Sequence, residues 1–194
     1  ISGNRKKLNW SEIPTKVDFY DLKGDLETIY SGYSFRPAIV PFLNPTKTAA
    51  VFKGKKQVGY LGSLNLKLME KMDIKQEVHF FELNLDNFEH SKKTKFKGFS
   101  GFPQAQRDLS FIINSEVSSA EVMKLIIQKS GKELKEINIF DVYRGRGIPK
   151  GKKSLAFSLS WQASNRTMTD IEIDDIVKKI VSFLYSKLDA KLRN

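Results

Sequence analysis

The strict alternation of residues 155–162 constrains the fold of this chain more than any other feature of its sequence. Large apolar side chains alternate there with small or polar ones: Leu155, Phe157, Leu159 and Trp161 against Ala156, Ser158, Ser160 and Gln162. A period of two places these sets on opposite faces of one strand, one buried and one small and polar. A second apolar run lies before it, and Pro149-Lys150-Gly151 indicates a turn between the two. Residues 134–163 therefore predict a strand, a long loop and a strand.

This loop lies in a window from Val142 to Thr169 that contains no acidic residue. The basic residues of the window are Arg144, Arg146, Lys150, Lys152, Lys153 and Arg166. A sheet face of small side chains beside a basic loop suits a flat, anionic ligand that stacks, which indicates nucleic acid. The alternative is that Arg144-Gly-Arg146-Gly147 is only a tight turn that carries charge.

Composition supports a polyanionic partner and excludes several kinds of chemistry. A formal charge of +11 over 194 residues favours nucleic acid, although a lysine-rich proteome also makes many proteins basic. The absence of cysteine excludes disulfides, thiol catalysis and cysteine-ligated zinc, and it fits a reducing compartment. No apolar run is long enough to span a membrane. The start lacks both methionine and a signal-peptide core, so we expect a piece of a longer protein.

The first half of the chain predicts a mixed unit of helices and strands. Apolar residues at helical spacing, among them Leu22, Leu26 and Ile29, indicate a helix over 17–30 with Asp18 as its cap. The elements expected next are extended chain over 35–40, a loop over 41–45, a hairpin over 49–61, a short helix over 64–72 and an aromatic strand over 77–85. The lysine-rich segment that follows breaks this pattern and is predicted to connect two domains. We expect domains over 1–90 and 102–194, with a linker over 91–101.

The second half predicts a ferredoxin-like fold. The expected order is a strand over 108–114, a helix from Ser118 to Gly131, the two strands described above, a helix from Thr169 and a last strand within 188–193. Glu121 and Glu172 follow Ser118 and Thr169 at the spacing of a capping box. This β-α-β-β-α-β order places both helices on one face of the sheet and leaves the other open. The fold class of the whole chain is therefore α+β.

No catalytic and no metal-ligating residue is predicted. His79 and His90 have no evident partner in the sequence, and His79, which alternates with Phe80 in a predicted strand, is interpreted as structural. The acidic residues of 170–175 complement a helix dipole, which we prefer to a metal site. The loop 114–117 contains an acid and no glycine, which argues against the phosphate cradle of a small hydrolase of the same topology.

Four blocks of the second half resemble a known family. They are Phe102-Pro103 with Arg107-Asp108-Leu109, Phe140-Asp141-Val142-Tyr143-Arg144-Gly145, Gly151-Lys152-Lys153-Ser154-Leu155-Ala156-Phe157, and Arg166-Thr167-Met168-Thr169-Asp170. In this order they resemble the ferredoxin-fold anticodon-binding domain that ends the beta subunit of bacterial phenylalanyl-tRNA synthetase. Residues 17–26 and 58–62 resemble the preceding part of that subunit, a class II synthetase-like antiparallel module that is not catalytic and is here truncated at its front.

The resemblance implies a function and its partners. The family enzyme is a cytoplasmic (αβ)₂ tetramer that uses ATP and Mg²⁺ to join phenylalanine to its tRNA, with the catalytic centre in the alpha subunit. This chain would then carry no catalytic centre, no metal ligand and no cofactor of its own, would not be active alone, and would bind the anticodon region of tRNA. The residues we expect to contact RNA are Arg107, Tyr143, Arg144, Arg146, Lys150, Lys153, Ser158, Ser160 and Arg166. Two alternatives stay open: a sequence-tolerant RNA- or DNA-binding module, and a ferredoxin-like regulatory domain for a small ligand.

Overall fold

The computed structural model describes residues 1–7, 10–29, 32–84 and 98–193 of the chain. These residues form two compact units, divided between Lys93 and Thr94, and each is described by itself. His90 and most of the predicted linker, residues 91–97, lie outside the described residues.

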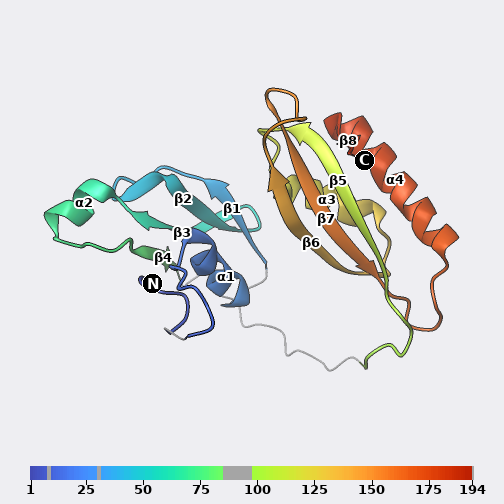
Figure 1. The fold of residues 1–194 in the computed structure, drawn as a ribbon, viewed down its shortest axis with the longest axis horizontal. Coiled ribbons are helices and arrows are strands. Elements are labelled where there is room, and N and C mark those ends of the chain that lie inside the picture. The colour runs from blue at the N-terminus through green and yellow to red at the C-terminus, as the bar shows by residue number, and fades with distance from the viewer. Residues whose placement is uncertain (8–9, 30–31, 85–97, 194) are drawn as a thin grey trace. The chain divides into compact units, whose positions relative to one another are not determined.

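The first unit is a four-stranded antiparallel sheet with one long helix on it (Figure 1). Its elements are α1 (Phe19–Ile29), β1 (Tyr33–Pro37), β2 (Leu43–Lys53), β3 (Lys56–Leu64), α2 (Leu66–Lys71) and β4 (His79–Leu83), and the strand order is β1-β2-β3-β4. The predicted cap of α1 is confirmed, because Asp18 Oδ1 accepts from the N–H groups of Tyr20 and Asp21 at 2.7 and 3.1 Å. Leu22 and Leu26 are buried against the sheet as expected, whereas Ile29 is exposed in the last turn.

One element of the first unit differs from the prediction. The expected loop over 41–45 is shorter, because β2 already begins at Leu43 and contains Pro45. Pairing between β2 and β3 is interrupted by a register shift between Leu43 and Thr48. Proline has no N–H to donate to a ladder, and an irregular stretch of this kind is where a strand tolerates it.

The second unit has the predicted β-α-β-β-α-β order. Its elements are β5 (Ala105–Asn114), α3 (Ser119–Lys129), β6 (Leu134–Tyr143), β7 (Lys152–Trp161), α4 (Asp170–Leu188) and β8 (Lys191–Leu192). The strands form one antiparallel sheet in the order β6-β7-β5-β8. The strand, loop and strand predicted for residues 134–163 are β6, the segment 144–151 and β7.

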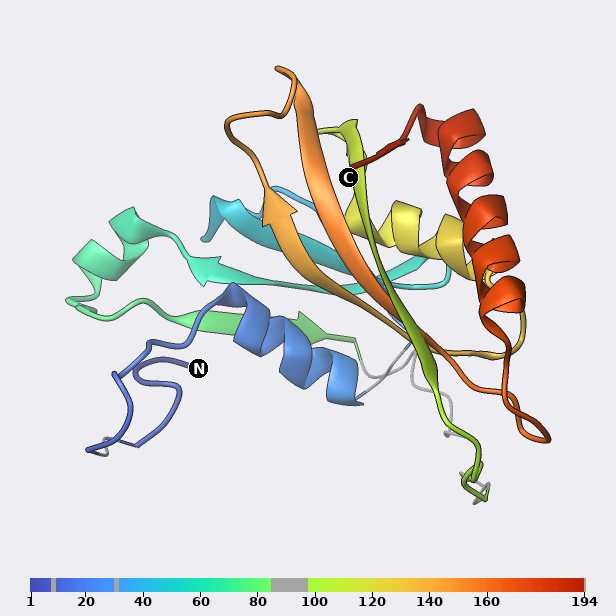
Figure 2. The ribbon, with the colours of Figure 1, turned by 45° about the vertical axis from the view of Figure 1, so that its right-hand side comes forward.

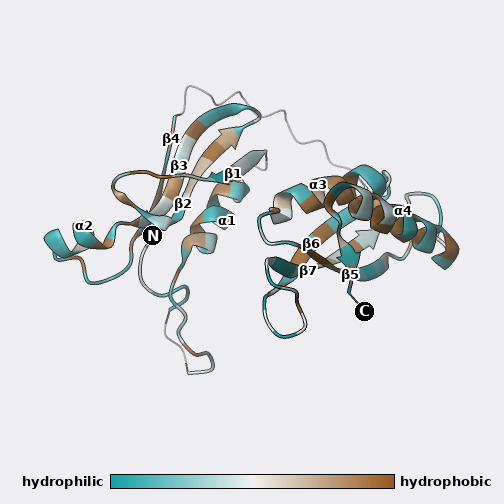
Figure 3. Cartoon of the chain, turned by 90° about the horizontal axis from the view of Figure 1, so that it is seen from above, coloured by the Kyte–Doolittle hydropathy of each residue, from teal (hydrophilic) through white to brown (hydrophobic). Residues whose placement is uncertain are grey.

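Both helices of this unit lie on one face of the sheet (Figures 1 and 2). Leu155, Phe157, Leu159 and Trp161 of β7 are at most 1% exposed and form the core with α3 and α4. Figure 3 shows both helices carrying apolar and polar segments side by side, as amphipathic helices do when one face is buried. The alternation in the sequence thus gave the correct buried face.

The two predicted helix starts are confirmed to different extents. At α4, Thr169 and Glu172 form the full capping box. At α3, the hydroxyl of Ser118 accepts from the N–H of Glu121 at 3.2 Å, which is one half of such a box. Gly131, with φ of +78°, follows α3 and takes the left-handed conformation that ends a helix.

Candidate nucleic-acid interface

The face of the second sheet opposite α3 and α4 is the candidate interface, and we call it the open face. It carries small and polar side chains from the two central strands: Gln106, Asp108 and Ser110 from β5, and Ser154, Ala156, Ser158 and Ser160 from β7. Several of them are already hydrogen-bonded to each other. Gln106 Nε2 donates to Ser158 Oγ at 2.7 Å, and Ser160 Oγ donates to Gln104 Oε1 at 2.9 Å. Ile112 of β5 lies on the same face, opposite Ser154. Ser154 and Ala156 are buried, whereas Ser158 and Ser160 farther along are half-buried.

The loop 144–151 stands at one end of the open face and is folded by two turns. The N–H of Ile148 donates to the carbonyl of Gly145 at 3.1 Å, and that of Lys152 to the carbonyl of Pro149 at 3.0 Å. Gly147, at a φ of +88°, takes a left-handed conformation that disfavours a side chain. The loop is therefore ordered by its own backbone rather than by its charged side chains.

Three cations of this loop are exposed. Among the described residues the structure gives no ion pair for Arg144, Arg146 or Lys150. An exposed arginine without an ion pair can bind two phosphate oxygens at once, because no bond to a carboxylate has to be broken first. These three residues form a cationic rim beside the open face.

Lys153 belongs to the same end of the sheet but serves a different purpose. Its side chain lies on the face covered by the helices, is 8% exposed, and donates to the carbonyl of Ser115 at 2.9 Å. Burial lowers its pKa, and the neighbouring Arg144 lowers it further. Lys153 therefore fastens the segment after β5 to the start of β7.

Arg107 and Arg166 lie at the other end of the sheet from the loop. Arg107 has the same orientation as Leu109, toward the helices, and its Nη2 is 2.7 Å from Asp170 Oδ1. Arg166 precedes α4 and makes two contacts of 2.7 Å with Glu172. Both guanidiniums are neutralised by acids of α4. Of the nine residues predicted to contact RNA, the structure therefore gathers Tyr143, Arg144, Arg146 and Lys150 at the loop, with Ser158 and Ser160 farther along the open face.

Tyr143 ends β6 on the open face, directly under the loop. Its hydroxyl donates to the carbonyl of Arg146 at 3.3 Å, and its ring lies 5.1 Å from the guanidinium carbon of Arg193. Sequence reasoning did not find Arg193, because it lies outside the acid-free window. Only the pairing of β8 with β5, which carries the end of the chain to this sheet, places it here.

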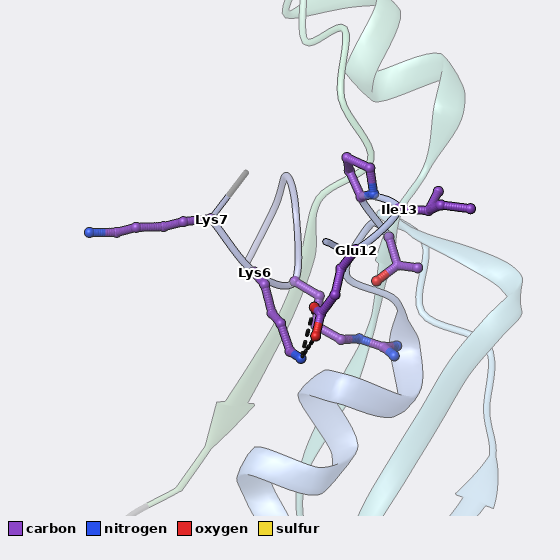
Figure 4. Close-up of a pocket in the computed structure, with 7 residues that line it drawn as sticks. Lys6, Lys7, Glu12 and Ile13 are labelled. Atoms are coloured by element: carbon purple, nitrogen blue, oxygen red, sulfur yellow. Dashed lines mark hydrogen bonds and ion pairs between the residues drawn. The ribbon is translucent and has the colours of Figure 1, made fainter. Parts of the chain in front are cut away.

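Other parts of the described chain do not compete as sites. A hollow of about 390 Å³ in the first unit is lined by residues 5–7 and 12–15, where Lys6 Nζ pairs with Glu12 at 3.0 Å (Figure 4). His79 is buried with its Nδ1 2.8 Å from Ser63 Oγ, which fits the predicted structural role. No group of three or more described His, Asp or Glu residues could hold a metal ion. None of the described helices is long and apolar enough to cross a membrane.

Comparison with known proteins identifies both halves of the chain. Residues 1–85 match the family model of the phenylalanyl tRNA synthetase beta chain CLM domain, and residues 100–193 match that of the ferredoxin-fold anticodon binding domain. The chain belongs to the phenylalanine–tRNA ligase beta-subunit family. The resemblance seen in the sequence is thereby confirmed for both halves.

Individual relatives give the same family. The phenylalanine–tRNA ligase beta subunits of Pseudomonas putida and Shewanella oneidensis are each 36% identical to this chain, and that of Legionella pneumophila is 34% identical. Each alignment covers 100% of this chain and 25% of the relative. The chain therefore spans about a quarter of the length of these relatives and carries the part that contains the anticodon-binding domain.

Proposed function

We propose that this chain binds the anticodon region of phenylalanine tRNA through the loop 144–151 and the open face. The observation that supports this most is the cationic rim of Arg144, Arg146 and Lys150, which is exposed and unpaired within the described structure beside a flat polar sheet. Single-stranded RNA is recognised on such sheets, where bases stack on aromatic rings and edges meet small polar side chains. The loop supplies the phosphate contacts that this recognition needs.

The nine predicted contacts divide into three groups under this proposal. Arg144, Arg146 and Lys150 bind phosphates, and Tyr143 supplies a ring for stacking, which contributes about 1–3 kcal/mol for a base. Ser158 and Ser160 meet base edges farther along the sheet. The remaining three support the site from behind: Lys153 fixes the loop, while Arg107 and Arg166 fix the start of α4.

The wider assembly is also a proposal. The relatives are beta subunits of a ligase, so we propose an alpha subunit as partner in an (αβ)₂ tetramer, located in the cytoplasm, that charges tRNA with phenylalanine using ATP and Mg²⁺. We propose no step of that reaction for this chain. Its contribution is to hold the tRNA.

Charge reversal in the loop tests the RNA-binding proposal. Phenylalanine tRNA is titrated against the wild-type chain and against Arg144→Glu/Arg146→Glu at two salt concentrations. We expect the variant to bind at least tenfold more weakly and to show a shallower salt dependence, because each lost phosphate contact lowers the slope by about one. The matched control is Lys55→Glu/Lys56→Glu, an equal charge reversal at the exposed β2–β3 turn of the first unit.

The outcomes separate the alternatives. Equal binding by wild type and loop variant shows that the loop is not the site, and it favours a small-ligand domain if neither binds RNA. If both charge reversals weaken binding equally, the chain acts as a general polycation. Competition with an unrelated tRNA then decides between a sequence-tolerant module and one that selects phenylalanine tRNA, since only the second discriminates.

A further inference from the structure

A hollow in the first unit combines an apolar lining with two exposed lysines. It has a volume of about 340 Å³ and lies between the loop before β2 and the helix α2. Three apolar and three polar residues line it: Pro41, Phe42 and Leu68, and Asn65, Lys67 and Lys71. The RNA contacts proposed above do not involve any of them.

The ring of Phe42 is fixed by two other aromatic rings. It stacks on Phe80 with the centroids 6.1 Å apart, and it meets Tyr60 edge to face at 5.6 Å. The two partner rings alternate with Leu61 and Phe81, which pack toward α1, so they lie on the opposite face of the first sheet. Phe42 nevertheless remains 38% exposed. An aromatic side chain that is already fixed loses little freedom when a partner binds to it.

The helix α2 is attached to the same loop. The N–H of Asn65 donates to the carbonyl of Phe42 at 3.0 Å, and Asn65 Oδ1 accepts from the N–H of Lys67 at 2.9 Å. Met69 is buried and anchors the helix. Lys67 and Lys71 are four residues apart, so they lie on one side of α2, where both line the hollow. The fold thus holds two cationic side chains beside the Phe42 ring.

The charges of these lysines are not neutralised within the described structure. Both side chains are exposed, and no ion pair among the described residues involves either of them. The single carboxylate of α2 belongs to Glu70, which does not line the hollow. The hollow is therefore complementary in charge to a partner that carries carboxylates.

The lining favours a protein segment over a nucleic acid. Arginine forks give planar recognition of phosphate, and no arginine lines the hollow. Pro41 and Leu68 match an apolar side chain, and a nucleotide offers no aliphatic one. An apolar centre with charged groups around it is the usual arrangement of a protein interface, and fixed aromatic rings are common anchors there.

We propose that this hollow is a docking site for an acidic protein segment, which packs one aromatic or large aliphatic side chain against Phe42 and Leu68. The carboxylates of the segment lie near Lys67 and Lys71. The apolar anchor supplies most of the affinity, and the lysines select acidic segments and speed their association. The inference goes beyond the proposed RNA binding and does not depend on it.

A peptide titration tests the docking site. The probe is the peptide Asp-Glu-Glu-Phe-Glu-Glu-Asp with blocked ends, added to the full chain labelled with ¹⁵N, and amide shifts are followed by NMR. We expect saturable shifts in residues 65–71 and in the loop before β2. Replacing the phenylalanine of the peptide by alanine should weaken binding at least about tenfold. Added salt should weaken binding of the acidic peptide as well, because exposed charges are screened.

Charge reversal on α2 tests the role of the lysines. Lys67→Glu/Lys71→Glu should bind the acidic peptide at least about tenfold more weakly, because like charges then face each other. Lys55→Glu/Lys56→Glu changes the net charge equally at the β2–β3 turn, away from the hollow, and should bind the peptide as wild type does.

A second pair of variants tests the apolar lining. Leu68→Ser removes one apolar wall and should weaken peptide binding about tenfold. Leu66→Ser makes the same change in the same helix, at an exposed residue that does not line the hollow, and should leave binding unchanged. Thermal unfolding of each variant verifies that the first unit remains folded.

The results that contradict the docking site differ from those that contradict RNA binding. The docking site is wrong if the peptide causes no saturable shift in α2, if its alanine form binds equally well, or if both charge reversals have the same effect. It is also wrong if a uridine oligonucleotide shifts these amides and the peptide does not, which indicates a second nucleic-acid surface. The loop proposal is tested separately by Arg144→Glu/Arg146→Glu with tRNA, so either proposal can fail alone.

Discussion

Arg166 and Glu172 form a two-pronged ion pair at the start of α4, with both nitrogen–oxygen distances at 2.7 Å. The same carboxylate accepts from the N–H of Thr169 at 2.9 Å and so completes the capping box. These contacts, with Arg166 first, lower the pKa of Glu172 to about 2. Arg166 therefore orders a helix start, and its charge is compensated within the fold.

Acid should weaken the second unit through Glu172. The pKa of this group falls from its ordinary 4.5 to about 2 on folding, so the unfolded chain takes up the proton first as the pH decreases. The stabilisation is complete above about pH 4.5 and is lost as the pH falls toward 2. Thermal unfolding of wild type and Glu172→Gln should show a difference in Tm that is largest near neutral pH and shrinks in acid.

The corresponding control is Glu121→Gln at the third residue of α3. Glu121 lies at the same position of its helix, but the described contacts contain no arginine bound to it. Its Tm difference from wild type should be small at every pH. A Glu172→Gln difference that stays constant from pH 6 to pH 3 would contradict the assignment of the acid response to this carboxylate.

Trp161 should be the more important of the two tryptophans for stability. Its side chain is fully buried, and its Nε1 donates to the carbonyl of Ser130 at 2.9 Å. Trp161→Phe leaves that buried carbonyl without its donor and opens a cavity, so we expect the free energy of unfolding to fall by about 2–4 kcal/mol. Urea denaturation measures this free energy of unfolding. Trp10, at 99% exposed, provides the control, and Trp10→Phe should change the value by no more than about 0.5 kcal/mol.

The sequence predicted the second unit well because its signals are local and repeated. Alternation identified the buried face of β7, and the Thr169 capping box identified the start of α4. The error at residues 41–45 arose from treating two prolines as the end of regular structure. Pro45 stands in β2 where the pairing is interrupted, and that interruption depends on the partner strand and not on the local sequence.

The site was harder to predict because charge alone does not give a face. In β5 Arg107 lies two residues before Leu109, and in β7 Lys153 lies two residues before Leu155, so each shares a face with a buried leucine. The alternation therefore indicates that both side chains lie on the face that the helices cover. Their prediction as RNA contacts rested on charge and not on this signal, and it stays a prediction. Arg193 carries no such signal, since its position beside Ser110 follows from the pairing of two strands far apart in the chain.

Arg107 and Lys150 should therefore differ in their effect on RNA binding. Arg107 is paired with Asp170 and Asp174 at 2.7 and 3.6 Å, whereas Lys150 is exposed and has no ion pair in the described structure. Lys150→Gln should lower the slope of log affinity against log salt by about one, and Arg107→Gln should leave it unchanged. Titrations over a series of salt concentrations measure both. Equal slopes for the two variants would support the prediction that Arg107 contacts RNA.

Gly145 should control the Tyr143 ring. A Cβ at this position would lie 2.8 Å from Tyr143 Oη and 3.0 Å from Cζ, so Gly145→Ala must displace the end of the ring and weaken its bond to the carbonyl of Arg146. No positive φ strains the backbone here, so stability should change by no more than about 0.5 kcal/mol. Affinity for a hairpin RNA with the anticodon arm of phenylalanine tRNA should fall about fivefold, because Tyr143 loses its stacking position.

Two further variants decide whether this effect passes through the ring. Gly101→Ala places a methyl group in open space at a residue without a positive φ, and it should bind the hairpin as wild type does. In a Tyr143→Leu background Gly145→Ala should lower the affinity for the hairpin only slightly further, because the effects of coupled residues do not add. A full fivefold loss in that background would mean that Gly145 acts through the path of the loop backbone and that the ring is not its target.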